Sequence, residues 1–324
     1  MFRRGRRLRD TAIIRDLVRE NELSVKDFIL PIFVVEGENI KREISSLKGN
    51  YHWSVDRLGE LVKELKETGV RSVIIFGVPE HKDCKGTEAY NENGIVQKAI
   101  RKLRELDDEL YIITDVCMCE YTNHGHCGIL HGKSIDNDET LEYLGKIALS
   151  HAKAGAHMIA PSDMMDGRIG YIRKVLDDNG FKMTPIMSYA AKYASGFYGP
   201  FREAAGSAPQ FGDRKGYQMD PANSREAMLE IEADINEGAD IIMVKPAMSY
   251  LDIVREARNR YDVPLCVYNV SGEYAMVKSA GEAGLIDEKR VALEMLMSMK
   301  RAGAKMIMTY YAIEAARWLK EDSN

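Results

Sequence analysis

The chain has 324 residues, a length that fits two average domains or a single α/β barrel. Its 45% hydrophobic and 29% charged residues are ordinary for a globular protein, and the net charge of −5 argues against a nucleic-acid-binding protein. No apolar run reaches the roughly 18 residues of a membrane span, and no apolar region of a signal peptide follows the start. Five cysteines do not make a disulfide framework in a chain of this length. We therefore expect a cytoplasmic protein that binds neither nucleic acid nor membrane.

The start of the chain is a basic block. It contains Arg3, Arg4, Arg6, Arg7 and Arg9. A transit peptide can also be rich in arginine, but this block is short and lacks serine. We expect residues 1–27 to form an extended arm that docks on a partner subunit, with a merely solvated tail as the alternative.

A repeated theme follows the arm, in which an amphipathic stretch ends at a glycine and a short apolar run comes next. Gly69, Gly155, Gly238 and Gly303 mark the four clearest junctions, as expected for helix ends in the left-handed conformation. The predicted strands are Phe28–Val35, Ser72–Val78, Leu110–Val116, His157–Pro161, Met183–Ser188, Asp240–Lys245, Pro264–Val270 and Lys305–Tyr310. The predicted helices are Ser54–Glu67, Gly94–Leu106, Asp138–Lys153, Gly167–Asn179, Ser224–Glu237, Leu251–Arg260 and Asp287–Arg301.

These elements predict an α/β fold, a (β/α)8 TIM barrel over residues 28–324. The strands are almost continuously apolar, which is typical of parallel strands covered on both faces. A doubly wound open sheet is the alternative, and the absence of a Gly-x-Gly-x-x-Gly motif after an early strand weakens its dinucleotide-binding form. The segment 189–221 lacks a long apolar pattern, and we expect it to form an active-site lid.

Two lysines are the sharpest candidates for chemistry. Lys245 ends an apolar strand, where burial lowers the pKa of an amine and a neutral amine can form a Schiff base with a ketone. Lys192 follows the preceding strand, so the two amines should share a pocket and titrate as a coupled pair. The alternatives are a lysine at the barrel rim whose head reaches solvent and an ordinary surface lysine.

Three cysteines predict a metal site. Cys117, Cys119 and Cys127 can offer three thiolates to a zinc ion and leave a fourth position open for water or substrate. His124 and His126 lie in the same loop, so a closed structural site remains an alternative, as do three inert buried cysteines. Cys84 and Cys266 are interpreted as structural.

Two arginines and one acidic loop are further candidates for binding groups. Arg202 and Arg214 lie in the predicted lid, and guanidinium groups bind carboxylates through two hydrogen bonds, although solvated loop arginines are also common. The run Ser162–Arg168 looks like a metal or phosphate loop, but its Asp163 and Asp166 more readily orient neighbouring groups or cap the next helix.

Taken together, these strings closely resemble the porphobilinogen synthase family, also called 5-aminolevulinate dehydratase. The similarity covers essentially the whole chain, and it is carried by Asp115-Val-Cys-Met-Cys119, His124-Gly-His-Cys127, Ala160-Pro-Ser-Asp-Met-Met-Asp-Gly-Arg168, Ser188-Tyr-Ala-Ala-Lys192, Phe197-Tyr-Gly-Pro-Phe-Arg202, Met243-Val-Lys-Pro246, Tyr268-Asn-Val-Ser-Gly-Glu273 and Thr309-Tyr310. The resemblance implies a (β/α)8 barrel with an arm, a homo-octamer, and condensation of two 5-aminolevulinate molecules into porphobilinogen with loss of two waters, an early step toward haem and other tetrapyrroles.

The resemblance also implies a role for individual residues. Lys245 would form the Schiff base with the first substrate and Lys192 would be the second active-site lysine. Ser271 and Tyr310 would bind the first carboxylate, and Arg202 and Arg214 the second. The remaining matches are Cys117, Cys119 and Cys127 as zinc ligands and Tyr198, Phe201, Gln218 and Tyr268 as pocket and lid residues.

A magnesium site is implied more weakly. Some members of the family carry an allosteric magnesium on a glutamate fifteen residues before the Schiff-base lysine, and Glu230 has that position here, although it also reads as an ordinary exposed helix residue. Other members replace the cysteines with oxygen ligands, but all three are present in this chain.

Two other functions fit part of the pattern. A class I aldolase-like Schiff-base lyase would account for Lys245 but would leave the three cysteines without a task. A non-enzymatic metal-binding protein would use the cysteines but not the paired lysines and the arginines.

Overall fold

Eight parallel strands form a barrel. The structure, a computed structural model, describes residues 2–321. The barrel strands are β1 (Phe28–Val35), β4 (Ser72–Val78), β5 (Tyr111–Val116), β8 (Met158–Pro161), β9 (Met187–Lys192), β10 (Ile241–Lys245), β11 (Leu265–Asn269) and β12 (Met306–Thr309). They follow the order β8-β5-β4-β1-β12-β11-β10-β9, and the two ends meet at a parallel bridge between Ile159 and Ile186. The (β/α)8 prediction is therefore confirmed, and the open-sheet alternative is wrong.

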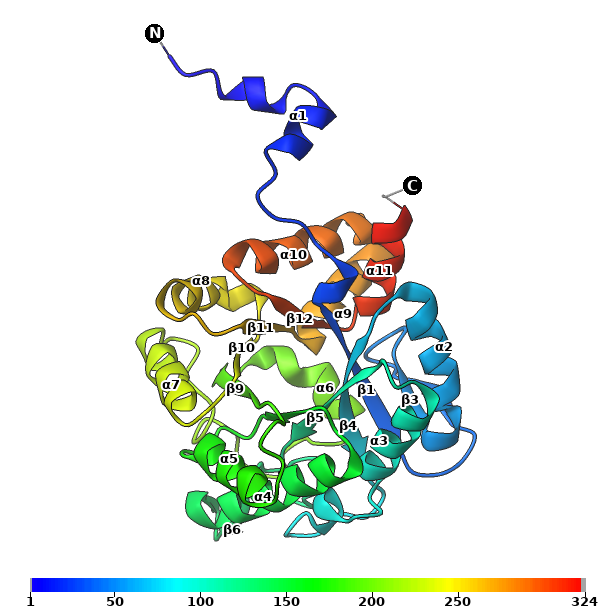
Figure 1. Cartoon of the computed structure of the whole chain (residues 1–324), viewed down its shortest axis with the longest axis vertical. Helices are drawn as coiled ribbons and strands as arrows, with labels where there is room; N and C mark the ends of the chain where they lie inside the picture. The colour runs from blue at the N-terminus through cyan, green and yellow to red at the C-terminus, as the bar shows by residue number, and fades with distance from the viewer. Residues whose placement is uncertain (1, 322–324) are drawn as a thin grey trace.

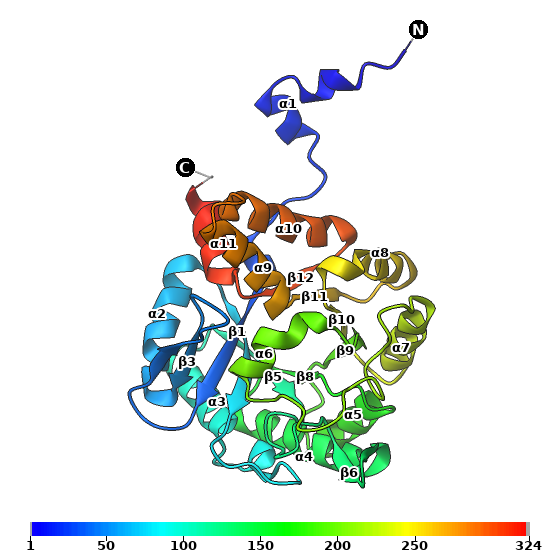
Figure 2. The same cartoon turned by 180° about the vertical axis from the view of Figure 1, so that it is seen from behind.

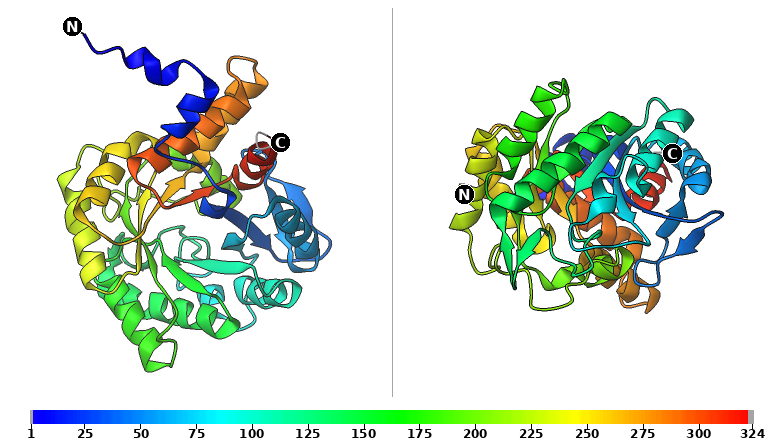
Figure 3. Two further views of the ribbon diagram at one scale, coloured as in Figure 1. Left: turned by 45° about the horizontal axis from the view of Figure 1, so that its top comes forward. Right: turned by 90° about the horizontal axis from the view of Figure 1, so that it is seen from below.

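Helices surround the strands (Figures 1 and 3). The predicted ones are α2 (Leu58–Thr68), α3 (Ile95–Leu106), α4 (Asn137–Ala154), α5 (Arg168–Asp178), α7 (Arg225–Asn236), α8 (Leu251–Arg260) and α10 (Glu288–Ala302). Those not predicted are α1 (Ala12–Leu17), α6 (Gly199–Ala204), α9 (Ser271–Glu282) and α11 (Ala312–Glu321). Short 3₁₀ helices are η1 (Gly5–Arg9), η2 (Val25–Asp27), η3 (Val55–Arg57), η4 (Thr87–Tyr90), η5 (Gly196–Tyr198) and η6 (Met248–Tyr250). Outside the barrel path, β2 (Lys41–Glu43) pairs with β3 (Tyr51–Ser54), which also pairs with β1, and β6 (Ile129–His131) pairs with β7 (Ser134–Asp136).

The glycine junctions behave as the sequence predicts. Gly69 follows α2 with φ of 82°, and Gly155 follows α4 with φ of 105°. A side chain is strained in this left-handed region, so glycine lets each helix stop and the next strand begin within a few residues.

The fifth barrel strand differs from its prediction. The expected strand Met183–Ser188 is wrong at both ends, because Met183 is 94% exposed in the turn after α5 and the strand runs on from Met187 to Lys192. The apolar Met183 ahead of Pro185 was mistaken for the start of a strand. The observed strand instead extends to Lys192 and contains the polar Ser188 and Lys192. Residues 189–192 of the segment predicted as a lid are therefore strand.

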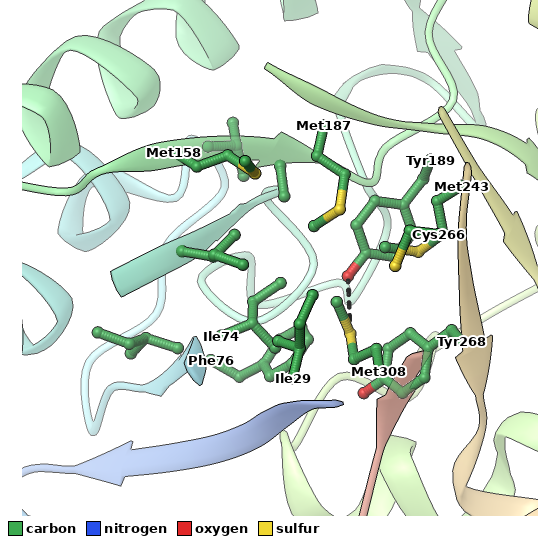
Figure 4. Packing of buried hydrophobic residues seen from close by; sticks show 14 of the residues in the cluster. Ile29, Ile74, Phe76, Met158, Met187, Tyr189, Met243, Cys266, Tyr268 and Met308 are labelled. Carbon is green, nitrogen blue, oxygen red and sulfur yellow. Dashed lines mark hydrogen bonds between the residues drawn. The ribbon is translucent and has the colours of Figure 1, made fainter. Parts of the chain in front are cut away.

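The barrel is filled by apolar side chains, many of which contain sulfur. Met158, Met187, Met243, Cys266 and Met308 point toward one another between the strands (Figure 4). A second layer of buried side chains lies between the strands and the helices. Burial of each large aliphatic side chain contributes about 1.5–3 kcal/mol.

The first residues of the chain extend away from the barrel, with α1 standing clear of it (Figures 1 and 2). Several apolar side chains of this arm are exposed, among them Phe2, Ile13 and Leu17, which are 72%, 73% and 75% exposed. Within residues 2–321, every helix is too short or too polar to cross a membrane.

Candidate active site

Two buried lysines lie side by side where β9 and β10 end. Lys192 and Lys245 are register partners on these adjacent strands, and they are 4% and 5% exposed. Because parallel strands all end at the same rim of a barrel, this is the rim where active sites of such barrels lie. The predicted pairing of the two lysines is therefore found in the structure.

Aromatic rings surround the amine of Lys245. Its Nζ lies 4.3 Å from the ring centroid of Tyr268, 5.0 Å from that of Phe201 and 5.2 Å from that of Tyr198. Burial, followed by the neighbouring charge of Lys192, lowers the pKa of Lys245 to about 7. A lowered pKa favours the uncharged amine, the form that can act as a nucleophile.

Lys192 contacts a different set of groups. Its Nζ donates to the backbone carbonyl of Ser162, whose Oγ in turn donates to Asp115 Oδ2 at 3.1 Å. Burial and then the carboxylate of Glu120 raise the pKa of Asp115 to about 8. Asp115 Oδ1 has no hydrogen-bond partner among residues 2–321. No individual role was predicted from the sequence for Asp115 or Ser162, whereas the structure brings both to the lysine pair.

The three predicted metal ligands form one cluster. The Sγ atoms of Cys117, Cys119 and Cys127 all lie within 4.8 Å of one another, and the three residues are buried. The Sγ atoms of Cys117 and Cys119 are 3.4 Å apart, and all three cysteines are free thiols. Three convergent soft donors fit a zinc ion, and a bound cation would favour their thiolate forms.

Neither loop histidine joins this cluster. The ring of His126 contacts the Tyr217 hydroxyl at 3.2 Å and the Phe211 carbonyl at 3.0 Å. His124 Nδ1 accepts the backbone N–H of His126. The structure therefore groups the three thiols without either histidine.

A small cavity joins the two lysines, Cys119 and the two arginines. Its lining consists of Phe76, Cys119, Glu120, Ser162, Lys192, Tyr198, Phe201, Arg202, Arg214 and Lys245. Its volume is about 10 Å³, room for about one water molecule. The side chains themselves therefore fill most of the space between the candidate catalytic groups.

The two arginines keep free donors. Arg214 is 5% exposed and donates to the Gly125 carbonyl at 2.9 Å and to the Ser207 carbonyl, while Arg202 lies on α6. The Nε atoms of both are buried without a hydrogen-bond partner in the part of the chain that the structure describes. Unused guanidinium donors of two neighbouring arginines suit an anion such as a carboxylate.

The other predicted site residues lie near the cavity or farther out. Tyr310 bonds the Tyr268 hydroxyl at 2.9 Å. Ser271 Oγ, at the start of α9, accepts the Phe201 N–H at 3.0 Å. Gln218 is buried with an unpartnered amide, as judged over residues 2–321, and it lines an outer groove of about 480 Å³.

Glu230 lines the same outer groove. It is half-buried on α7, near Asp166 and Glu226, and burial is the main cause that raises its pKa.

The suggestion that Asp163 and Asp166 of the Ser162–Arg168 run cap the next helix is wrong, because Gly167 is the N-cap of α5 and Asp163 accepts the Met165 N–H instead.

The sequence is similar to a known protein family. Residues 2–318 match the sequence model of the family described as "Delta-aminolevulinic acid dehydratase". Proteins of that name from Bacillus subtilis and Staphylococcus aureus are 55% and 53% identical, with 99% and 98% of this chain and 99% of each relative covered.

A solved structure is similar over nearly the whole chain. The delta-aminolevulinic acid dehydratase (porphobilinogen synthase) of Toxoplasma gondii ME49, solved in complex with porphobilinogen, gives a TM-score of 0.97 at 43% identity, over 99% of this chain and 93% of that one. Dihydropteroate synthase from Stenotrophomonas maltophilia, at 11% identity and a TM-score of 0.51 over 93% of this chain and 94% of that one, shares the fold alone. By sequence and by structure, the chain belongs to the delta-aminolevulinic acid dehydratase family.

Proposed function

We propose that this protein is a porphobilinogen synthase, a lyase that joins two molecules of 5-aminolevulinate into porphobilinogen and releases two waters. Family membership supports the overall reaction. The observation that carries the proposal for this site is the pairing of Lys245 with Lys192 in one buried cavity that also receives two arginines. An aldolase-like lyase needs only one such lysine, and a metal-binding protein needs neither.

Lys245 starts the reaction. Its uncharged amine attacks the ketone carbon of the first substrate, and loss of one water leaves an imine. Tyr268, Phe201 and Tyr198 keep bulk water from the amine, which favours the uncharged form and protects the imine from hydrolysis.

Lys192 activates the second substrate in the same way. An imine makes the adjacent carbon acidic, so that carbon can lose a proton and attack the other activated ketone. Asp115, with a raised pKa and a free oxygen beside Ser162, is placed to hold or return a proton during these steps.

Two anchor pairs hold the carboxylates. The free donors of Arg202 and Arg214 support their assignment to the second substrate. Ser271 and Tyr310 belong to the first, and both must exchange a present hydrogen-bond partner for the carboxylate.

Metal ions complete the proposal. Cys117, Cys119 and Cys127 would hold zinc, which as a Lewis acid polarises a carbonyl, lowers the pKa of a bound water or orients the second amine. Glu230, with Asp166 and Glu226 beside it, would hold a magnesium ion through oxygen ligands.

The rest of the chain serves access and assembly. The segment 193–221 closes over the cavity as a lid, and α6 is held by the His52 ring, which contacts the Ala204 carbonyl at 2.6 Å. The exposed apolar side chains of the arm support docking on a second copy within a homo-octamer. Free thiols fit a reducing compartment such as the cytoplasm.

One experiment tests the proposal. Incubation with 5-aminolevulinate, with and without zinc, should yield a pyrrole, and borohydride should fix substrate mass on Lys245. Folded, zinc-loaded protein that forms neither pyrrole nor adduct would reject the proposed reaction.

A further inference from the structure

Strand β9 contains a β-bulge just before Lys192. Ser188 lies opposite Ile242 of β10, but Ala191 lies opposite Val244, so Tyr189 and Ala190 together face a single residue of β10. A bulge of this kind adds one residue to one strand and disturbs the hydrogen-bond ladder there.

The bulge decides where Lys192 points. Side chains of a regular strand alternate between its two faces, and Tyr189 points into the barrel (Figure 4). Three residues later, a regular strand would turn Lys192 outward toward the helices. The extra residue restores the inward direction and places Lys192 opposite Lys245.

A buried arginine holds the bulged backbone. Arg168, the first residue of α5, is 2% exposed. Its Nη2 donates to the Tyr189 carbonyl at 3.2 Å and to Ser188 Oγ at 3.0 Å. The carbonyl within the bulge therefore gains a charged donor from outside the sheet.

The same guanidinium is fixed from a third side. Asp234 of α7, the helix that precedes β10, accepts from Nη2 at 3.0 Å and from Nη1 at 3.3 Å. Ser188 Oγ also donates to Asp234. A fork of parallel hydrogen bonds to a carboxylate sets the plane of the guanidinium as well as its position.

Arg168 also reaches the loop that contacts the amine of Lys192. Its Nη1 donates to the Met165 carbonyl at 3.2 Å, and Ser162 in the same loop accepts from Lys192 Nζ. Arg168 therefore bonds both groups that support Lys192: the bulged strand that carries it, and the loop whose Ser162 carbonyl accepts from its Nζ.

We propose that Arg168 is a positioning residue that clamps the β9 bulge to the 162–168 loop and so turns Lys192 into the cavity beside Lys245. This inference rests on the proposed role of Lys192 in the reaction. Arg168 touches neither substrate nor the reacting atoms, and it acts through the direction of another side chain.

The first test is Arg168→Lys. The ammonium keeps the charge beside Asp234 but cannot bond Tyr189, Met165 and Asp234 together. We expect kcat to fall about 100-fold, as for a misplaced catalytic group, with a much smaller change in KM. Borohydride capture of substrate should persist at Lys245 and decline at Lys192.

A second variant guards against simple unfolding. Arg168→Met combined with Asp234→Leu removes both partners of the ion pair at Asp234. Asp163, whose Oδ1 lies 3.8 Å from Arg168 Nε, keeps its hydrogen bond from the Met165 N–H, so the barrel should fold while the clamp is lost. The control is Arg173→Lys on the same helix, since Arg173 bonds the Thr184 and Phe181 carbonyls at 2.7 Å and 2.9 Å ahead of β9. The control should retain parental kcat.

Crystal structures of the double variant decide the mechanism. We expect the bulge to be lost or displaced and Lys192 to leave Ser162. Parental kcat in both Arg168 variants, or an unchanged bulge with Lys192 still inward, would overturn the proposal. If the unsubstituted protein gives no adduct at Lys192, the proposed role of that lysine fails, while the crystal structure still decides what Arg168 does.

Discussion

Removing the charge of Lys192 should raise the pKa of Lys245 and slow substrate capture there. Lys192→Met keeps the length of the side chain and deletes the ammonium. Burial is the larger cause of the low pKa of Lys245 and Lys192 the second, so only part of the shift should disappear.

The size of the effect follows from the register of the two strands. The lysines are partners on adjacent parallel strands with side chains on one face. At the roughly 5 Å spacing of adjacent strands, and with an effective dielectric constant of about 20, the repulsion is about 3 kcal/mol, or about 2 pKa units. Lys192 also lowers the pKa of Asp115, so its removal leaves Asp115 protonated more often and weakens the effect of that carboxylate on Lys245. We therefore expect the pKa of Lys245 to rise by about 1 to 2 units.

The assay is borohydride trapping of 5-aminolevulinate on Lys245, quantified by peptide mass between pH 6 and pH 10. The midpoint of capture should move from about 7 toward 8 or 9, and the uncharged fraction at pH 7 should fall roughly 5- to 50-fold. Lys182→Met, an exposed lysine ahead of the same strand, is the control. A midpoint that stays near 7 in Lys192→Met would refute the electrostatic coupling of the two amines.

Four further outcomes are expected. A chelator should abolish pyrrole formation and zinc should restore it, whereas full activity of metal-free protein would exclude a catalytic metal. Arg214→Met should raise KM by roughly 30-fold with a smaller effect on kcat, because one charged hydrogen-bond set worth about 2 kcal/mol is lost, and an unchanged KM would remove Arg214 from the carboxylate site. Deleting residues 1–10 should give a smaller assembly in sedimentation, and an unchanged profile would remove the arm from the interface. Burial raises the pKa of Glu273 to about 7, so the folded state holds this proton more tightly than the unfolded state. The free energy of unfolding should therefore fall by up to about 3 kcal/mol as the pH rises from about 4.5 to 7. Glu273→Gln should flatten that part of the curve of unfolding free energy against pH, and an equally steep curve would contradict the assignment.

The sequence predicts the barrel well because its strands are apolar on both faces. Ser72–Val78 reads as a strand without ambiguity, and the structure begins and ends it at the same residues. Helix α9 was missed because its buried side chains, Ser271, Glu273 and Tyr274, leave no apolar stripe. Helix α11 was missed because its fully buried residues are alanines, such as Ala315 and Ala316.

The family and the lysine pair could also be predicted, whereas the support of that pair could not. Lys245 ends one recognisable strand and Cys117 directly follows another, so their place at one rim follows from the fold. The bulge at Tyr189 has no such signal, because its extra residue is set by tertiary contacts with Arg168 and Asp234. The place of Asp115 in the site depends on its burial and on its hydrogen bond from Ser162, and both are tertiary features.

The nearly filled cavity has a consequence for substrate affinity. The cavity beside Lys245 has a volume of about 10 Å³, so residues of α6 that line it, Phe201 and Arg202, must move to admit a substrate. The apparent dissociation constant then equals the intrinsic one divided by the fraction of molecules that stand open. Substitutions that loosen the contact between His52 and Ala204 should therefore tighten apparent binding of the first substrate, even though they add no new interaction with it.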